Sequence, residues 1–497
     1  MALMSKDSIV SGAGLLQKLR REAIGLDVQY ALATGERARR IYLDSTASTL
    51  RLKIVQQVLD KFQPHYSNTH TTVHFAAKLS TSEYRWAHDM VLDFVGADRD
   101  AYTCFFVGSG TTGGVNRIAR ALKESRPERD VVIASIMEHH SNDLPHRKHF
   151  REVVHVPAAM AAHSLGCVNL ERIEEALREY GPKVNYIAIT GVSNVTGIIN
   201  PIHDVAELAH RYGTLIVVDA AQMAAHIPIQ MSGHADAARN LDVLVFSGHK
   251  VYAPGSPGVV VTRKDLFAGI EPQEVGGGMV DQVYINRYTT TQEFPDREEA
   301  GTPNICGALG LAAALYVLNK VGMDTIADEE CRLIDYALKK LATVNGIIIY
   351  GETDCSLCER TAAISFNLKN LDHGLTAAVL NDYFNIAVRN ECFCAHPYVR
   401  EMITQSLAEE AERLSDEQLA NLAELHRGMV RASFGIYTTT EDIDALVTAL
   451  HHITSNKEFY EQQYTRLPSG DYGHKSFQFD HTQYFSVKEE VETGLSK

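Results

Sequence analysis

The chain alternates short apolar runs with amphipathic stretches over most of its length. The apolar runs are continuous, they are rich in β-branched or aromatic residues, and most are bounded by Gly, Ser or Asn. Such runs are typical of strands that are buried on both faces, and the amphipathic stretches between them predict covering helices. We therefore predict an α/β fold with a mainly parallel sheet. Its strands are expected at residues 103–107, 131–135, 186–190, 215–219, 243–247 and 259–262.

The same pattern divides the chain into four segments. Residues 1–40 are predicted to be a helical segment that joins a small domain, and residues 41–320 are predicted to form a large domain that carries the sheet. Beyond a long apolar helix, strand and helix alternate less regularly, so we expect residues 321–455 to form a smaller α+β domain. Residues 456–497 are polar and aromatic without periodicity, and we expect a tail that packs on a surface or stays mobile.

Composition excludes several classes of partner. The 497 residues carry 47 Lys and Arg against 62 Asp and Glu, a net charge of −15 at pH 7. Because nucleic acids and anionic membranes bind clustered cations, neither is expected as a partner. The N-terminus lacks the apolar core of a signal peptide, and the longest apolar stretch, near residues 307–318, is too short to span a bilayer. We predict a cytoplasmic protein whose eight scattered cysteines are reduced.

Glycine and hydroxyl residues follow the first predicted strand. Four glycines between residues 108 and 114 allow a tight turn, and Thr111 and Thr112 place hydroxyl and amide groups at the start of a helix. Unpaired N–H groups and the helix dipole stabilise an anion there, so a phosphate fits. The segment lacks the lysine of a nucleoside triphosphate loop. A plain strand-to-helix turn with a threonine cap is the alternative.

Three further side chains follow predicted strands. Asp219 ends a buried strand, where it either caps the next turn or faces a ligand atom that it keeps protonated. Lys250 is either a solvated lysine or a partly desolvated one, whose lowered pKa makes the neutral amine available for an imine. His139 offers a flat ring. A phosphate cradle, an acid, a lysine and a flat ring together match the needs of pyridoxal phosphate.

Seven short motifs stand out along the chain. They are GTTGGVN at 110–116, EHHSN at 138–142, SNVTG at 193–197, VDAAQ at 218–222, SGHK at 247–250, EAGTPN at 299–304 and RASFGIY at 431–437. Together they resemble the class V aminotransferase group of fold-type I pyridoxal-phosphate enzymes, and within it the cysteine desulfurase and selenocysteine lyase branch. The resemblance runs from about Tyr42 to Leu450, and it implies a large domain that binds the cofactor and a smaller α+β C-terminal domain.

The resemblance implies a site for pyridoxal 5′-phosphate. Lys250 would form the Schiff base with the cofactor aldehyde, and His139 would stack on the ring and take part in proton transfer. Asp219 would pair with the pyridine nitrogen, and Gln222 would donate to the ring oxygen. The cofactor contacts that it implies are Thr111, Thr112, His139, Asn194, Asp219, Gln222, Ser247, His249, Lys250 and Thr302.

The resemblance also implies how the substrate and a second subunit would bind. Arg431 would hold the substrate carboxylate, a task suited to the guanidinium fork. Asn194 and Arg389 would be further substrate contacts. Thr302 would reach the phosphate of the neighbouring subunit, which implies a homodimer with shared active sites.

One cysteine is marked by its place in a family loop. Arg389 and Cys394 keep the five-residue offset and the following Ala-x-Pro of the nucleophile loop of the resembled family. The family commonly has Gly, His and His at positions 391–393, which hold Glu, Cys and Phe here, and Gln where this chain has His396. The predicted function is a desulfurase that converts L-cysteine to L-alanine and leaves a persulfide on Cys394, with a sulfur-acceptor protein as a possible partner.

Three alternatives remain open from the sequence. A C–S or C–Se lyase, an epimerase or an aminotransferase of the same family would need no persulfide. Cys355 and Cys358 have the spacing of a zinc pair, which Cys392, Cys394 or His396 could complete. A non-catalytic binding protein is disfavoured because the lysine, the acid and the arginine of the motifs are all present.

Overall fold

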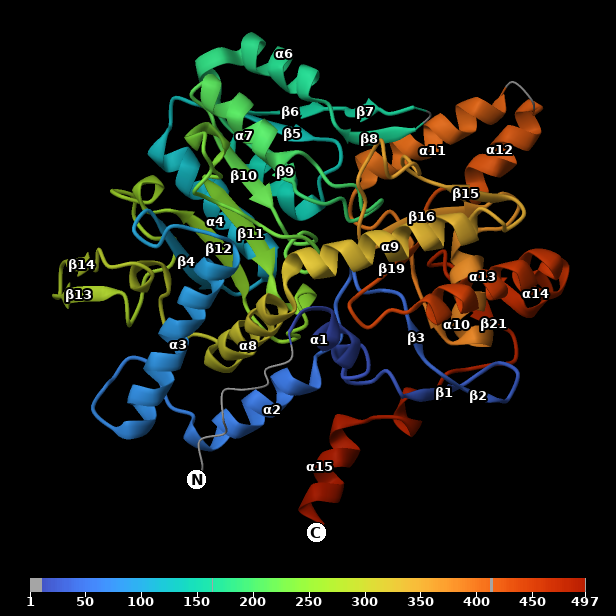
Figure 1. Ribbon diagram of the computed structural model, residues 1–497, viewed down its shortest axis with the longest axis horizontal. Helices are drawn as coiled ribbons and strands as arrows, with labels where there is room; N and C mark the ends of the chain where they lie inside the picture. Colours follow the sequence, from blue (N-terminus) through green and yellow to red (C-terminus); the bar gives the residue numbers. More distant parts are fainter. Residues whose placement is uncertain (1–10, 163, 412–413, 497) are drawn as a thin grey trace.

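The computed structural model describes residues 11–162, 164–411 and 414–496, which are built around two sheets (Figure 1). The larger sheet has seven strands in the order β4-β12-β11-β10-β9-β5-β6. Adjacent strands of this sheet are parallel, except that β12 is antiparallel to both β11 and β4. The strands are β4 (Tyr102–Val107), β5 (Val131–Ser135), β6 (Glu152–Val156), β9 (Val184–Thr190), β10 (Leu215–Asp219), β11 (Val243–Ser247) and β12 (Gly258–Arg263).

Both faces of this sheet are buried, which explains the continuous apolar runs. Successive side chains of a strand point to opposite faces. In β4, Phe105 packs with helix α4 (Gly110–Ser125) in one core cluster. Its neighbour Phe106 packs in another core cluster with α7 (Ile202–Arg211) and α8 (Ile305–Val321). The prediction of an α/β fold with a mainly parallel sheet is confirmed, and only β6 was missed, because that strand is half exposed.

The smaller sheet is antiparallel, with strands in the order β15-β16-β19-β18. Helices α9 (Met323–Leu341), α10 (His373–Phe384) and α13 (Thr440–Ser455) contribute to its core. The helices lie beside the sheet on the right of Figure 1. The strands are β15 (Ile347–Ile349), β16 (Ala363–Leu368), β18 (Arg389–Glu391) and β19 (Met429–Ser433).

The N-terminal segment differs from the helix expected over residues 1–40. Its first ten residues lie outside the described part of the chain. After α1 (Gly12–Leu19), the chain forms a hairpin of β1 (Gln29–Ala31) and β2 (Arg37–Arg39), whose turn uses Gly35 at a φ of +87°. The pairing of β3 (Ile41–Tyr42) with β17 (Ile386–Ala387), which precedes β18 in the chain, then brings this segment to the smaller sheet. The domain boundaries drawn above remain a proposal.

The C-terminal segment packs on the rest of the protein through tyrosine side chains as far as Tyr484. The Tyr464 hydroxyl donates to Asp382 at 2.9 Å, and the backbone N–H of Ala31 donates to the Tyr484 hydroxyl at 2.8 Å. These contacts tie residues after 463 to the small-sheet helices and to the N-terminal hairpin. The last helix, α15 (Val487–Leu495), projects from the body at the bottom of Figure 1.

The other regular elements connect or cover these parts. They are α2 (Lys53–Phe62), α3 (Phe75–Phe94), α5 (Leu144–His149), α6 (Leu170–Tyr180), α11 (His396–Ala411), α12 (Asp416–Leu425), α14 (Lys457–Gln463), β7 (Ala158–Met160), β8 (Leu165–Val168), β13 (Val280–Val283), β14 (Tyr288–Thr290), β17 (Ile386–Ala387), β20 (Tyr464–Arg466) and β21 (Tyr472–His474).

Among the described helices, none is by itself long and apolar enough to cross a bilayer. Helices α8 and α9 reach that length and hydropathy only when taken together, and they meet at a bend of 78°.

A glycine in the turn between the two sheets gives a test of the fold. Gly197 has a φ of +73°, and a Cβ there would overlap the carbonyl oxygen of Thr361 and lie 2.7 Å from that of Ala363. Gly197→Ala should therefore lower the free energy of unfolding by about 3 kcal/mol or more, from strain and overpacking together. Urea denaturation measures this change.

The matched control is Gly213→Ala. Gly213 has a similar φ of +65°, but no atom lies within 4 Å of the added Cβ. This change should lower the free energy of unfolding by only about 1 kcal/mol, because the only penalty is the strain of a left-handed alanine. Equal losses in the two variants would contradict the close packing of the turn.

Candidate active site

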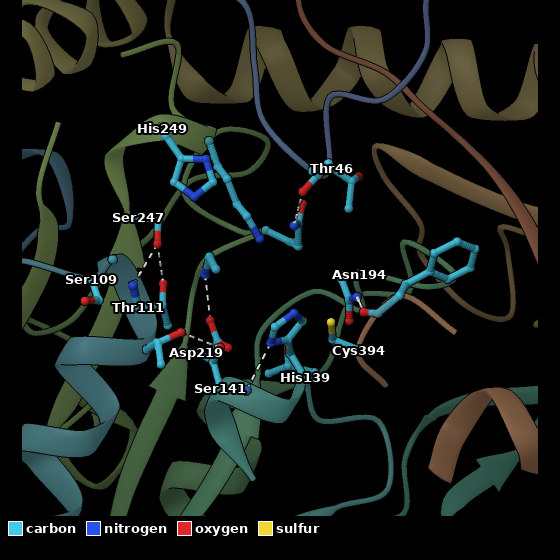
Figure 2. A pocket seen from close by; sticks show the side chains of 18 of the residues that line it. Thr46, Ser109, Thr111, His139, Ser141, Asn194, Asp219, Ser247, His249 and Cys394 are labelled. Atoms are coloured by element: carbon cyan, nitrogen blue, oxygen red, sulfur yellow. Dashed lines mark hydrogen bonds between the residues drawn. The ribbon is translucent and has the colours of Figure 1, made fainter. Parts of the chain in front are cut away.

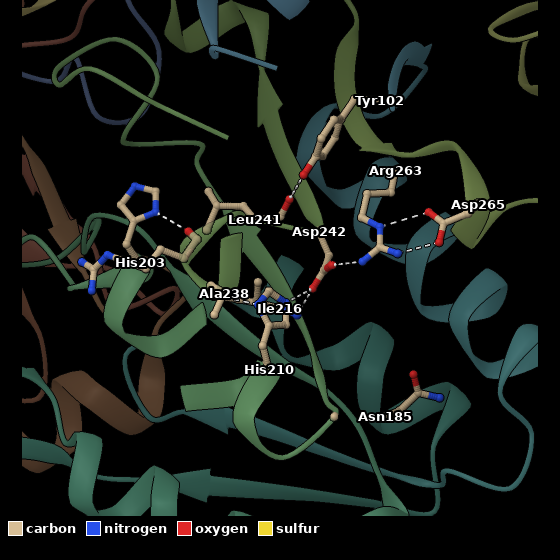
Figure 3. A network of polar contacts seen from close by, with 12 residues as sticks. Tyr102, Asn185, His203, His210, Ile216, Ala238, Leu241, Asp242, Arg263 and Asp265 are labelled. Atoms are coloured by element: carbon tan, nitrogen blue, oxygen red, sulfur yellow. Dashed lines mark hydrogen bonds and ion pairs between the residues drawn. The ribbon is translucent and has the colours of Figure 1, made fainter. Parts of the chain in front are cut away.

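A cavity of about 400 Å³ opens where the two sheets meet, at the carboxyl ends of β9, β10 and β11 (Figure 2). Ligands of parallel sheets gather at this edge. Of the residues predicted for the site, the structure brings all but Thr302 to this cavity. They are Thr111, Thr112, His139, Asn194, Asp219, Gln222, Ser247, His249, Lys250, Arg389, Cys394 and Arg431.

One end of the cavity is rich in hydroxyl groups around the start of α4. The backbone N–H of Thr111 donates to the Ser247 hydroxyl at 2.7 Å, and the two hydroxyls lie 2.8 Å apart. The Thr112 hydroxyl lies 2.6 Å from that of Ser141. Gly110 turns into the helix at a φ of +60°, and a Cβ there would lie 2.6 Å from the Ser247 oxygen. Hydroxyls and amide N–H groups around a helix start suit a phosphate.

An acid and a lysine occupy the centre of the cavity. Asp219, at the end of β10, is 3% exposed, and burial raises the pKa of its carboxyl group. Lys250 follows β11, and burial lowers the pKa of its amine to about 8, although the charge of Asp219 acts in the opposite direction. The amine is therefore neutral in roughly a tenth to a fifth of molecules near physiological pH, far more than for an ordinary lysine, and nucleophilic attack on an aldehyde requires the neutral form.

His139 presents a neutral ring to the same space. Its Nδ1 accepts a hydrogen bond from the backbone N–H of Ser141 at 3.0 Å, so the proton of the neutral ring is on Nε2. Burial, with a further contribution from Lys250, lowers the pKa of His139 to about 3. Figure 2 shows this ring beside Asp219. The side chain can stack on a flat ligand and hold one proton at Nε2.

Two arginines and one carboxylate lie where the small sheet meets the cavity. Arg431 is 2% exposed, and it donates to the Asn194 carbonyl at 2.9 Å and to Asp44 at 3.2 Å. Arg389, its partner across strands β18 and β19, lies 4.0 Å from the same carboxylate. Burial lowers the pKa of Arg431 to about 10, and its Nε has no hydrogen-bond partner in the described part of the chain. A buried arginine with an unpaired Nε and an exposed second arginine, set against one carboxylate, suit a carboxylate ligand.

The loop that carries Cys394 has a strained backbone. Glu391, Phe393 and Cys394 have φ values of 97°, 50° and 57°. Hydrogen bonds to its carbonyls hold the loop, because the Asn194 side-chain amide donates to the Phe393 carbonyl at 2.8 Å and the backbone N–H of His140 donates to the Cys394 carbonyl at 2.7 Å. The Cys394 thiol is exposed, and Figure 2 shows it close to His139 and Asn194.

The remaining residues that were predicted to contact a cofactor differ in their placement. Gln222 donates to the Thr46 carbonyl at 2.7 Å, and His249 Nδ1 lies 3.2 Å from the Ser48 hydroxyl. Thr302 lies outside the cavity, exposed, and its hydroxyl accepts from Asn68 at 3.3 Å. Its predicted contact with a neighbouring subunit remains a prediction.

Sequence reasoning missed several residues that shape the cavity. Thr46 lines the cavity and Asp44 contacts Arg431, and both come from the segment after the two-residue strand β3, which gives no apolar run to mark it. Ser141 and Phe393 also line the cavity. The guanidinium of Arg431 lies 4.7 Å from the centre of the Phe393 ring. The EHHSN motif contains Ser141 and could have indicated it.

A metal site is not supported by the geometry. Within the described ranges, no three His, Cys, Asp or Glu side chains are grouped as metal ligands. The zinc alternative built on Cys355 and Cys358 therefore has no structural support.

Comparisons with known proteins agree with this geometry. The family model described as "Aminotransferase class-V" matches residues 41–446. A "Probable cysteine desulfurase" of Halalkalibacterium halodurans is 32% identical over 423 residues, which cover 84% of this chain and 94% of that protein.

Two solved structures are similar as well. The apo structure of a cysteine desulfurase from Thermococcus onnurineus NA1 has a TM-score of 0.73 and 26% identity, and the match covers 88% of this chain and 98% of that one. The cysteine desulfurase CsdA (S-sulfonic acid) from Escherichia coli has a TM-score of 0.66 and 28% identity, over 84% and 95% of the two chains.

The lowered pKa of Lys250 predicts an unusual pH dependence of its reactivity. In the protein freed of cofactor, trace labelling of Lys250 by an amine reagent should be half-maximal at about pH 8, against about 10.5 for an ordinary lysine. Peptide mapping after labelling at several pH values measures the midpoint.

Asp219→Asn is the matched variant for this test. The carboxylate raises the pKa of Lys250, so its removal should move the labelling midpoint below that of the unaltered protein. A midpoint near 10.5 would contradict the burial of the amine, and an upward shift in the variant would contradict its interaction with the Asp219 carboxylate.

Proposed function

Because the chain belongs to the class V aminotransferase family, we propose that it is a pyridoxal 5′-phosphate-dependent cysteine desulfurase that converts L-cysteine to L-alanine. The observation that carries this proposal is the Cys394 thiol, which a strained loop directs toward the lysine, acid and histidine of the cavity. Curated relatives that cover most of the chain are named cysteine desulfurases, which supports the same reaction.

The cavity fits the cofactor by the chemistry of its donors. Thr111, Thr112, Ser247 and His249 would hold the phosphate. Asp219 would face the pyridine nitrogen, Gln222 the ring oxygen and Lys250 the aldehyde, and the ring of His139 would cover the cofactor. When bound, pyridoxal phosphate supplies a ring that accepts the electrons released at the substrate α-carbon.

The chain's own groups would position the substrate and move its proton. Arg431 and Arg389 would bind the carboxylate of L-cysteine, and Asp44 would keep the two cations together. The amine of Lys250 would take the α-proton, which its lowered pKa permits near neutral pH. His139 would hold a proton at Nε2 for return to the product.

Sulfur transfer would take place at Cys394. Its thiolate attacks the substrate sulfur, an S–S bond forms, and the bond between the substrate β-carbon and sulfur breaks. The electron pair of the broken bond stays with the carbon fragment, which takes up protons to give alanine. One thiol and one cysteine thus yield one persulfide and one alanine, and no external oxidant is needed.

The same loop suggests what happens to the persulfide. Cys394 is exposed, so a sulfur-acceptor protein could reach it.

We retain the cytoplasm, which the sequence predicts, as the proposed location.

The proposed assembly is a homodimer with shared sites. Val73 and Phe75 are 87% and 91% exposed, which is unusual for large apolar side chains. They lie just beyond Asn68, which contacts Thr302. An apolar patch beside a residue predicted to serve a neighbouring site supports a second copy as the partner.

The Cys394→Ser variant tests the proposed reaction. Purified holoprotein is incubated with L-cysteine, and alanine and protein-bound persulfide are assayed together. The unaltered protein should form both in step, whereas the variant should lose persulfide and at least about 100-fold of the alanine-forming rate. Cys392→Ser is the control, since its thiol is buried and donates to the Arg427 carbonyl at 3.7 Å. It should retain both products.

Another result would favour a different reaction of the same family. Alanine without persulfide, at a rate that Cys394→Ser leaves unchanged, would assign a lyase. Turnover of another amino acid without sulfur release would assign an epimerase or aminotransferase.

The dimer predicts a separate result. Phe75→Asp should raise the dissociation constant of the dimer on the order of 100-fold, because a two-fold interface loses the burial of two rings. Sedimentation velocity measures the change, and Leu495→Asp, at a side chain that is 84% exposed on α15, should leave the dimer intact. An unaltered protein that sediments as a monomer would rule out the shared site.

A further inference from the structure

Two thiols outside the active site face each other across the junction of the two sheets. Cys167 lies on β8, in the hairpin between strands β6 and β9 of the large sheet, and Cys358 lies between β15 and β16 of the small sheet. Cys167 packs against the core cluster that contains Cys358, and each thiol shifts the pKa of the other. A Cβ added at Gly166 would lie 3.6 Å from Cys358 Sγ, which places this sulfur against the strand.

The backbone around the two cysteines is fixed on both sides. The N–H of Glu352 donates to the Leu165 carbonyl at 3.1 Å, which ties the Cys358 segment to β8. The N–H of Ile199 donates to the Glu359 carbonyl at 3.0 Å. Arg360 donates to the Glu352 carbonyl at 2.8 Å and to the Thr196 carbonyl at 2.9 Å. The two sulfurs therefore stay near each other without a change of fold.

The two thiols differ in a way that suits stepwise oxidation. Cys167 is the partly exposed thiol, so an oxidant in solution reaches it first, and its contact with Cys358 lowers its pKa. Cys358 is 6% exposed, and the same contact raises its pKa. An exposed thiolate beside a sheltered thiol is the arrangement of an attacking and a resolving cysteine.

We propose that Cys167 and Cys358 form a reversible disulfide when the protein meets a peroxide. The Cys167 thiolate attacks the peroxide oxygen, which gives a sulfenic acid and one water. Cys358 sulfur then attacks Cys167 Sγ, so that an S–S bond forms and the sulfenic oxygen leaves as a second water. Two thiols are oxidised by two electrons, hydrogen peroxide is reduced to two waters, and a thiol reductant reverses the change.

The disulfide would join the large-sheet hairpin to the segment that borders the active site. Residues 196–199, which pair with residues 359–361, follow directly after Asn194 in the chain. Asn194 in turn holds Phe393 and Arg431. The bond would thus restrain the contact between the two sheets without using a residue of the proposed reaction.

The test uses full-length holoprotein that carries Cys394→Ser, which removes the exposed thiol of the cavity. After limited hydrogen peroxide, trypsin without reductant should release residues 152–172 joined to residues 341–360, and dithiothreitol should separate them. The second peptide contains both Cys355 and Cys358, so Cys355→Ser is the matched control. The cross-link should persist in Cys355→Ser and disappear in Cys358→Ser and in Cys167→Ser.

A second readout guards against variants that fold poorly. The peroxide-treated protein should unfold at a higher temperature than its reduced form, and this difference should vanish in Cys167→Ser, whose side chain is partly exposed and tolerant of change. A cross-link through Cys355, or Cys167 recovered only as sulfinic or sulfonic acid, would overturn the proposal. Neither result bears on the desulfurase reaction, which is measured with Cys394 intact.

Discussion

A lysine amine and a carboxylate that are both removed from water stand at the centre of this structure. Burial lowers the pKa of Lys250 and raises that of Asp219. The charged form of each group is therefore less stable in the folded chain than in water. The strands that carry them, β11 and β10, are neighbours in a sheet that is packed on both faces. The apolar packing of these strands offsets the cost, and the same packing keeps the two groups from relaxing into solvent.

The second requirement is that three distant segments meet at one carboxylate. Asp44 comes from the N-terminal segment, and Arg389 and Arg431 come from the small sheet. Arg431 also binds the carbonyl of Asn194, which belongs to the turn after β9 of the large sheet. The proposed carboxylate site therefore exists only when both sheets are docked, so binding of the proposed substrate would depend on the packing of the two sheets.

Much of this arrangement could be predicted from the sequence, for a physical reason. Strands buried on both faces need continuous apolar runs, and their carboxyl ends meet at one edge, so Asp219 and Lys250 could be placed together in advance. The half-exposed strand β6, the hairpin at residues 29–39 and the role of Asp44 were missed. The valines of β6 are interrupted by His155, the other two segments carry no long continuous apolar run, and long-range contacts with the rest of the chain determine where all three lie.

The loop of Cys394 shows why backbone conformation was beyond sequence reasoning. Glu391 has a φ of 97°, in a region that glycine adopts freely, and two further residues of the loop are left-handed. Each such residue costs about 1–3 kcal/mol, so the loop persists only because its surroundings determine it. The bonds from Asn194 and His140 to main-chain carbonyls supply that restraint. Since they bind the backbone, the direction of the thiol is set by the fold of both sheets more than by the side chains at positions 391–393.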